Sequence, residues 1–180
     1  NKIVKVSSTY NFLKKLAIVK RNYFSGKIIA VTGSSGKTTV KDLLGNLLKN
    51  YGDTYYSPSS FNNFYGVPLS LCNLEKEHKF GVFEIGMSKS GEINDLSKIV
   101  KPDIAIITNI AEAHIENFKN LKGIAEAKSE IMNNIKKNGI IILNRDDKYF
   151  NYLYRKAKIK KLKVISFGFN KKSDVHPISI

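Results

Sequence analysis

Short apolar runs rich in β-branched residues alternate with stretches of helical periodicity along most of the chain. A run that is apolar at every position predicts a strand buried on both faces, which is typical of parallel sheets covered by crossover helices. We therefore expect an α/β fold with a mostly parallel sheet flanked by helices. The predicted strands span 27–32, 54–56, 80–85, 104–108, 140–143 and 164–167, and the predicted helices span 9–24, 38–49, 67–74, 92–100, 121–137 and 146–158.

The length of the chain indicates how many domains it forms, and its charge bears on whether it binds nucleic acid. Its 180 residues suit one domain, and a hydrophobic content of 42% is typical of folded proteins. The formal net charge of +15 raises nucleic acid as a partner. The excess is spread along the chain, however, and few basic residues are arginine, the side chain best suited to bidentate phosphate contacts. We therefore expect a solvated lysine surface and no specific nucleic acid, and the basic run 155–163 predicts the exposed face of a terminal helix.

Cysteine content and hydropathy bear on the compartment. The single cysteine, Cys72, cannot form an internal disulfide, and no Cys-x-x-Cys pair is present to bind zinc. These features favour a reducing, cytoplasmic location. No apolar run reaches the length of a membrane span, and no signal peptide is visible. The chain begins at Asn1 rather than Met and stops within an apolar stretch, so we expect a piece of a longer protein. We also expect a monomer in solution.

A glycine-rich turn follows the first predicted strand and leads directly into a helix. Glycines let the backbone curl so that successive N–H groups point into one cavity, and the helix N-terminus adds partial positive charge, which makes a triphosphate cradle. The lysine of such a motif neutralises the β- and γ-phosphates of ATP, and the next hydroxyl ligates Mg²⁺. The motif has the short form G-x-x-G-K-T, because Val31 stands where longer loops have their first glycine. The predicted cofactor-binding residues are Gly33, Ser34, Ser35, Gly36, Lys37, Thr38 and Thr39.

Other polar residues follow the remaining strands, at the edge where parallel sheets bind ligands. Glu84 ends an otherwise apolar strand, and a buried carboxylate there indicates either an Mg²⁺ ligand or a partner for a buried lysine. His114 lies just past the next strand and is either a site residue or an ordinary surface histidine. Asn62 and Asn63 precede a turn and can equally cap the following helix. Nothing in the periodicity around Lys128 distinguishes it from a solvated lysine.

The sequence contains VTGSSGKTT at 31–39 and FEIGMSKSGEI at 83–93. These and several other segments resemble the Mur ligases, a family of ATP-dependent amide-bond-forming enzymes of peptidoglycan synthesis. Within the family they are most similar to the member that adds D-alanyl-D-alanine to UDP-N-acetylmuramoyl tripeptide. The resemblance implies a P-loop-containing Mur ligase central domain, and it runs from about residue 24 to residue 168. The matching segments are VTGSSGKTT (31–39), FNNFYGVPLSL (61–71), FEIGMSKSGEI (83–93), KPDIAIITNIAEAHIENF (101–118), GIAEAKSEI (123–131) and LNRDD (143–147).

The resemblance implies a reaction. In the family, the substrate carboxylate attacks the γ-phosphate of ATP to form an acyl phosphate, and the amine of D-alanyl-D-alanine then displaces phosphate. By resemblance, Lys37 holds the phosphates, while Thr38 and Glu84 bind the first Mg²⁺. Catalysis in such a site depends mostly on neutralising the charge that develops on the phosphoryl group.

Three further roles follow from the resemblance alone. Asn62 or Asn63 lies near the γ-phosphate, and His114 matches a histidine associated with a second metal ion. Lys128 matches a lysine that is carbamylated in several members, where the carbamate turns a cation into a metal-binding anion. One position departs from the family, because Ser60 stands where an asparagine is often found two residues before Asn62.

The matching segments belong only to the middle one of the three domains that full-length family members have. This implies that residues 1–24 are a linker and leading helix, that 25–180 are the ATP-binding central domain cut short at its C-terminal end, and that both flanking domains are absent. We expect such a fragment to bind nucleotide weakly without catalysing ligation. The alternatives are another Mur-like amide ligase, of the folylpolyglutamate or cyanophycin synthetase type, and a basic nucleotide-dependent nucleic-acid-binding module. A P-loop kinase or GTPase is disfavoured, because the usual first glycine and Walker-B aspartate are missing.

Overall fold

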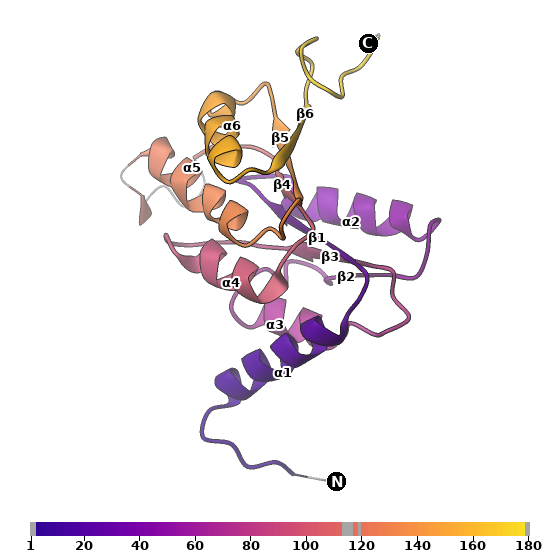
Figure 1. Ribbon diagram of the computed structural model, residues 1–180. Coiled ribbons are helices and arrows are strands. Elements are labelled where there is room, and N and C mark those ends of the chain that lie inside the picture. The colour runs from indigo at the N-terminus through magenta and orange to yellow at the C-terminus, as the bar shows by residue number, and fades with distance from the viewer. Residues whose placement is uncertain (1–2, 113–116, 119, 179–180) are drawn as a thin grey trace.

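The computed structural model describes residues 3–112, 117–118 and 120–178, and it shows the predicted α/β architecture. One sheet of six parallel strands has the order β2-β3-β1-β4-β5-β6, with helices on both sides (Figure 1). The strands are β1 (Lys27–Thr32), β2 (Thr54–Tyr56), β3 (Phe80–Glu84), β4 (Ile104–Ile107), β5 (Ile140–Asn144) and β6 (Lys163–Phe167). The helices are α1 (Thr9–Tyr23), α2 (Lys37–Leu48), α3 (Gly66–Cys72), α4 (Glu92–Val100), α5 (Leu121–Ser129) and α6 (Phe150–Ile159), and a 3₁₀ turn, η2 (Glu130–Asn133), follows α5.

Apolar side chains on both faces of the sheet explain where the helices lie. On one face, Ile29 and Val82 pack against Val40 and Leu44 of α2. The other face carries the larger core, which is covered by α3, α4, α5 and α6 (Figure 1). Strand β1 lies between these two layers and is buried at every residue after Lys27. The continuous apolar run that predicted this strand is therefore explained by its two covered faces.

The order of the strands indicates where a ligand would bind. The chain leaves β1 through α2 toward β2 on one side, and it leaves β3 through α4 toward β4 on the other side. Because β1 and β3 are neighbours, the loops that follow them diverge from one point at the carboxyl ends of the strands. Ligands of open α/β sheets bind at such a point.

One predicted helix and one predicted surface differ from the structure. The helix expected over 121–137 is α-helical only to Ser129 and continues as the 3₁₀ turn η2 to Asn133. The basic run 155–163 is not the face of a terminal helix, because α6 ends at Ile159 and the chain continues into β6, which begins at Lys163. Most of the basic side chains in this run are exposed, as predicted for a solvated surface.

The helix expected over 146–158 begins later than predicted, at Phe150. The Asp147 carboxylate accepts hydrogen bonds from the backbone N–H groups of Tyr149 (2.7 Å) and Ile110 (2.6 Å). A short acidic side chain that bonds nearby backbone groups favours a turn over a helix. These contacts keep residues 146–149 as a turn that joins the end of β5 to the segment after β4.

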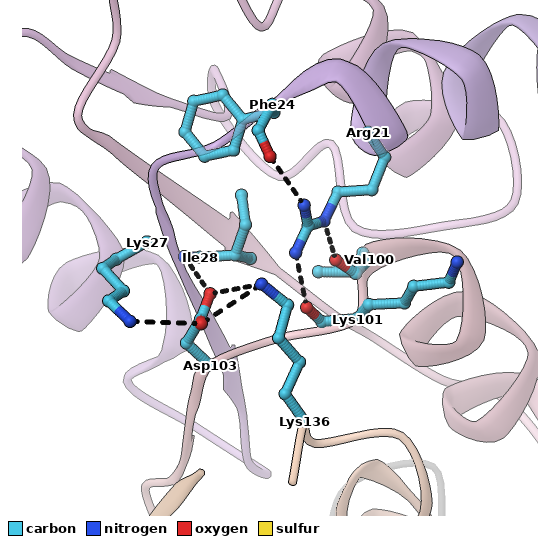
Figure 2. A network of polar contacts seen from close by, with 8 residues as sticks. All are labelled: Arg21, Phe24, Lys27, Ile28, Val100, Lys101, Asp103 and Lys136. Carbon is cyan, nitrogen blue, oxygen red and sulfur yellow. Dashed lines mark hydrogen bonds and ion pairs between the residues drawn. The ribbon is translucent and has the colours of Figure 1, made fainter. Parts of the chain in front are cut away.

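A buried arginine attaches α1 to the C-terminal end of α4 (Figure 2). The Nε atom of Arg21 donates to the carbonyl of Val100 (2.6 Å), and an Nη atom donates to the carbonyl of Lys101 (2.8 Å). These carbonyls end α4, where the helix dipole favours a cation. Another Nη atom donates to the carbonyl of Phe24 (3.4 Å) and so holds the turn that leads into β1. The leading helix is therefore packed against α4.

A carboxylate closes the amino ends of β1 and β4 (Figure 2). Asp103 accepts a hydrogen bond from the backbone N–H of Ile28 (2.9 Å) and forms ion pairs with Lys27 (3.6 Å) and Lys136 (3.2 Å). This network lies at the edge of the sheet opposite the carboxyl ends of the strands, so we infer that it stabilises the fold and takes no part in the candidate site.

Within the part of the chain that the structure describes, no helix is both long and apolar enough to span a membrane.

Candidate functional site

Residues 33–36 form a tight loop between β1 and α2, and its two glycines are needed for different reasons. Gly33 has φ 151°, and a Cβ atom there would lie 1.8 Å from Oγ1 of Thr108. Gly36 has φ 75° and is the residue from which α2 begins. Among the described residues, no side chain caps the N-terminus of α2. The partial positive charge of this helix end is thus available to an anion.

The segment after β4 braces the loop. The backbone N–H of Ser34 donates to the carbonyl of Asn109 (3.0 Å), and the N–H of Ser35 donates to Oδ1 of the same asparagine (2.9 Å). The Thr108 hydroxyl donates to the carbonyl of Ser35 (2.6 Å). The prediction that successive loop N–H groups face one cavity is therefore wrong for Ser34 and Ser35. We did not identify Asn109 from the sequence, and the only signal for it was its position directly after a buried strand.

Three side chains from different elements meet at the end of β3. Glu84 is 1% exposed, its Oε2 accepts a hydrogen bond from the Thr38 hydroxyl (2.7 Å), and its Oε1 accepts one from Nδ2 of Asn62 (2.6 Å). The prediction of a buried carboxylate is confirmed, and its hydrogen-bond partners are a hydroxyl and an amide rather than a lysine. Carboxylate, hydroxyl and amide oxygens are the ligand types that Mg²⁺ prefers.

Both predicted lysines donate hydrogen bonds to carbonyl groups of the loop. Nζ of Lys128 donates to the carbonyl of Gly33 (2.9 Å), and Nζ of Lys37 donates to the carbonyl of Ser34 (3.3 Å). Lys128 is 3% exposed, so its interpretation as a solvated lysine is wrong. Burial and, to a smaller extent, the positive charge of Lys37 together lower the pKa of Lys128 to about 7. The Lys128 amine is therefore partly neutral near pH 7.

A cavity of about 310 Å³ opens beside these groups. The side chain of Asn63 accepts hydrogen bonds from the backbone N–H groups of Tyr65 (3.1 Å) and Gly66 (2.9 Å), so it caps α3 and also lines the cavity. Sequence reasoning missed Glu92, whose carboxylate accepts from the N–H of Ser88 (2.6 Å) and shapes the loop that forms another part of the lining. The predicted residues in the lining are Gly33, Ser34, Lys37, Asn62, Asn63 and Lys128.

One predicted residue that the structure describes lies apart from this group. Thr39 is exposed in the first turn of α2. His114 lies outside the described residues. Within the described ranges there is no group of three or more histidine, cysteine or acidic side chains that could hold a metal ion. The candidate metal site therefore depends on Glu84 together with neutral oxygen atoms.

Comparison with known proteins finds one family. The model of the Mur ligase middle domain matches residues 31–179. UDP-N-acetylmuramoyl-tripeptide--D-alanyl-D-alanine ligase from Buchnera aphidicola subsp. Baizongia pistaciae is 41% identical over 175 residues, which are 97% of this chain and 38% of that protein.

Solved structures are similar over the same region. The crystal structure II of MurF from Acinetobacter baumannii has a TM-score of 0.90 at 38% identity and covers 98% of this chain. MurF ligase from Thermotoga maritima, solved in complex with ADP, has a TM-score of 0.80 at 37% identity and covers 94% of this chain. The match covers 38% and 40% of those two chains, respectively. The chain thus spans about two fifths of the length of the relatives it matches.

Proposed function

This chain belongs to the Mur ligase family as a middle domain, and from that premise we propose that it is the ATP-binding domain of a ligase that adds D-alanyl-D-alanine to UDP-N-acetylmuramoyl tripeptide. The similarity to a ligase of that name over 97% of the chain supports the choice of reaction. The observation that carries the proposal is the meeting of the phosphate loop, Glu84 and Asn62 at the carboxyl ends of β1 and β3. Phosphoryl transfer depends on such positioned charge and hydrogen bonds.

ATP is the proposed nucleotide. Its phosphates suit the N-terminus of α2, because no side chain in the described part of the chain caps this helix, which begins at the left-handed Gly36. Lys37 would bind the β- and γ-phosphates from the same turn. The N–H groups of Ser34 and Ser35 are bonded to Asn109 and so serve to hold the loop in shape. The relative from Thermotoga maritima was solved with ADP, which supports the same class of ligand here.

Magnesium is the proposed metal, and the donor atoms fit it. A buried carboxylate whose side-chain partners, among the residues that the structure describes, are a hydroxyl and an amide is stabilised by a hard cation. Thr38 and Glu84 would hold Mg²⁺, which would neutralise charge on the phosphoryl group during transfer. Asn62, which orients the Glu84 carboxylate, lies beside the proposed γ-phosphate position. The role of His114 at a second metal rests on the resemblance alone.

Lys128 is the residue that we expect to be carbamylated. An amine whose pKa is about 7 is substantially neutral at physiological pH and can attack carbon dioxide. The product is an anion beside Lys37, so the positive charge that lowers the pKa of the amine would stabilise the carbamate. A carbon-13 NMR spectrum recorded with labelled bicarbonate should show a carbamate signal that is absent in Lys128→Met. A spectrum without this signal in the unmodified protein would remove this part of the proposal.

The proposed reaction has two steps. A carboxylate oxygen of the tripeptide forms a bond to the γ-phosphorus while the bond to ADP breaks, and the amine of D-alanyl-D-alanine then attacks the carbonyl carbon and releases phosphate. Residues 25–180 would supply the nucleotide site, and domains beyond this chain would supply the two other substrates. A cytoplasmic location and a monomeric state stay predictions. We expect the isolated 180-residue chain to bind nucleotide without ligating.

The test uses the longer protein that contains this segment. We expect phosphate release that requires ATP, UDP-N-acetylmuramoyl tripeptide and D-alanyl-D-alanine together, and loss of at least 100-fold in rate for Lys37→Ala. Activity with a folate or an aspartate–arginine polymer instead would favour one of the alternative amide ligases. Ligation by the 180-residue chain alone would contradict the expected need for further domains.

A further inference from the structure

A lysine is among the largest side chains that are completely buried among the described residues. Lys41 lies one turn beyond Thr38 on α2 and is 0% exposed. Its Nζ atom donates to the carbonyls of Ser57 (2.6 Å) and Ser59 (2.9 Å) and forms an ion pair with Asp42 (2.9 Å). An ammonium group has three donors, and here three oxygen atoms receive them. Such a buried cation is tolerated only because its donors are satisfied, so these contacts are specific.

The segment that Lys41 holds leads directly into the candidate site. Ser57 follows β2, and its hydroxyl accepts a hydrogen bond from the backbone N–H of Glu84 (3.3 Å). Five residues later, Asn62 donates to the Glu84 carboxylate (2.6 Å) and its carbonyl accepts from the N–H of Gly86 (2.8 Å). The segment 57–62 therefore contacts β3 at both of its ends, and Lys41 holds it near the first.

The backbone of this segment needs an external restraint. Ser59 has φ 43°, which lies in the left-handed region that side chains other than glycine rarely adopt. That conformation is unfavourable for a non-glycine residue, because its Cβ atom crowds the backbone. The hydrogen bond from Lys41 to the Ser59 carbonyl offsets this cost in the folded protein. Without this hydrogen bond we expect Ser59 to leave the left-handed conformation. Asn62 lies three residues further along, so its position would change as well.

From these contacts we infer that Lys41 is a positioning residue of the site, which holds the segment 57–62 so that Asn62 and Glu84 keep their geometry. The role in catalysis rests on the proposed function, whereas the role in geometry does not. Helix α2 then positions both side chains that bond to the Glu84 carboxylate. It supplies the Thr38 hydroxyl directly, and it places the Asn62 amide through Lys41. Lys41 itself acts through this segment.

The first test measures geometry without any ligand. Nitrogen-15 NMR of the 180-residue chain reports the side-chain amide of Asn62, whose signals are assigned by their loss in Asn62→Asp. In the unmodified chain this amide should exchange slowly with water because Glu84 accepts its hydrogen bond. Lys41→Met should accelerate that exchange at least tenfold. Unchanged exchange of the Asn62 amide in a folded Lys41→Met would overturn the inference.

A matched control separates this effect from the general loss of a lysine on α2. Lys49 follows the same helix, is exposed, and lies over the ring of Tyr56, as Lys41 does (5.0 and 5.9 Å to the ring centroid). The structure records no bond from it to the segment 57–62. Lys49→Met should therefore leave the exchange of the Asn62 amide unchanged. An equal acceleration in both variants would show that Lys41 has no specific role.

The second test measures the site with nucleotide. The Mg²⁺ concentration that gives half-maximal ATP binding should rise at least tenfold in Lys41→Met and stay constant in Lys49→Met. If the unmodified chain binds no Mg·ATP, the proposed function fails, while the Asn62 exchange still decides the role of Lys41.

If Lys41→Met does not fold, Lys41→Gln replaces it in the exchange measurement, because the glutamine amide can still donate to a carbonyl. Its exchange should lie between those of the unmodified chain and a freely exposed asparagine, and wild-type exchange would again overturn the inference.

Discussion

Glu84 is the residue on which the proposed chemistry depends most. It is buried at the end of β3, and a hydroxyl and an amide fix the direction of its two oxygens. A carboxylate held in this way keeps its charge at one point and needs little reorganisation when a cation binds. The same burial makes an unpaired charge unfavourable in the absence of a cation. The residue is thus better suited to binding metal than to stabilising the fold.

That balance predicts that Glu84→Gln changes metal-dependent binding far more than it changes stability. The glutamine keeps the volume and can still accept from Asn62 and donate to Thr38, so the free energy of unfolding should change by no more than about 1 kcal/mol. The Mg²⁺-dependent part of ATP binding should fall at least tenfold, because a neutral amide is a poor magnesium ligand. Titration calorimetry with and without Mg²⁺ measures this, with the exposed Glu126→Gln as the control. Unchanged Mg²⁺ dependence in Glu84→Gln would remove Glu84 from the metal site.

Lys128 predicts a pH dependence of stability. Its pKa is about 7 in the folded chain, and its ordinary value is 10.5. Between these values the unfolded chain binds a proton that the folded chain does not, so the free energy of unfolding rises with pH across that window and its contribution is lowest below pH 7. Urea unfolding from pH 7 to 9.5, in buffer free of bicarbonate, should show the unmodified chain gaining stability relative to Lys128→Met. Parallel pH profiles would contradict the lowered pKa.

At the scale of elements, α2 is the helix that joins the site to the sheet. Its inner face carries Lys41 and Gly45, both buried. Gly45 lies against Tyr56 of β2, and a Cβ atom there would come within 2.5 Å of the ring. A glycine in the middle of a helix disfavours the helix by about 1 kcal/mol relative to alanine, so its presence here reflects this close approach.

Two glycine-to-alanine changes in helices should therefore have opposite signs. Gly45→Ala gains helix propensity but forces the Tyr56 ring aside, so we expect a net loss of about 1–3 kcal/mol in the free energy of unfolding. Gly123→Ala in α5 meets its nearest atom, in Phe118, at 3.5 Å, and should gain up to about 1 kcal/mol. Chemical denaturation of both variants provides the comparison. Stabilisation by Gly45→Ala would show that α2 does not lie as close to β2 as described.

The elements themselves were largely predictable from the sequence. The strands were found to within a residue at each end, because a strand covered on both faces has an unbroken apolar run. The start of α6 was missed by four residues because Asp147 bonds to backbone groups of Ile110 and Tyr149, and the first of these is far away in sequence. Periodicity records which face of an element is apolar, and it does not record such contacts.

At the scale of the whole molecule, the sheet order brings distant residues to one place. The position of the loop 33–36 and the buried carboxylate of Glu84 could be predicted from the sequence, because the loop directly follows the run of β1 and Glu84 ends the apolar run of β3. The burial of Lys128 could not be derived from periodicity, since it depends on a carbonyl of Gly33 that lies 95 residues away. The roles of Asn109 and Lys41 were missed for the same reason. Both bind backbone groups of other segments, and local patterns carry no trace of those partners.

The central claim is that this chain binds Mg·ATP through the loop between β1 and α2. The most direct test is titration calorimetry of Mg·ATP into the 180-residue chain, into Lys37→Ala and into Lys49→Ala, which removes an exposed lysine after the same helix. We predict measurable binding by the unmodified chain, similar binding by Lys49→Ala, and affinity at least tenfold lower for Lys37→Ala. Equal affinity of the unmodified chain and Lys37→Ala would contradict the account.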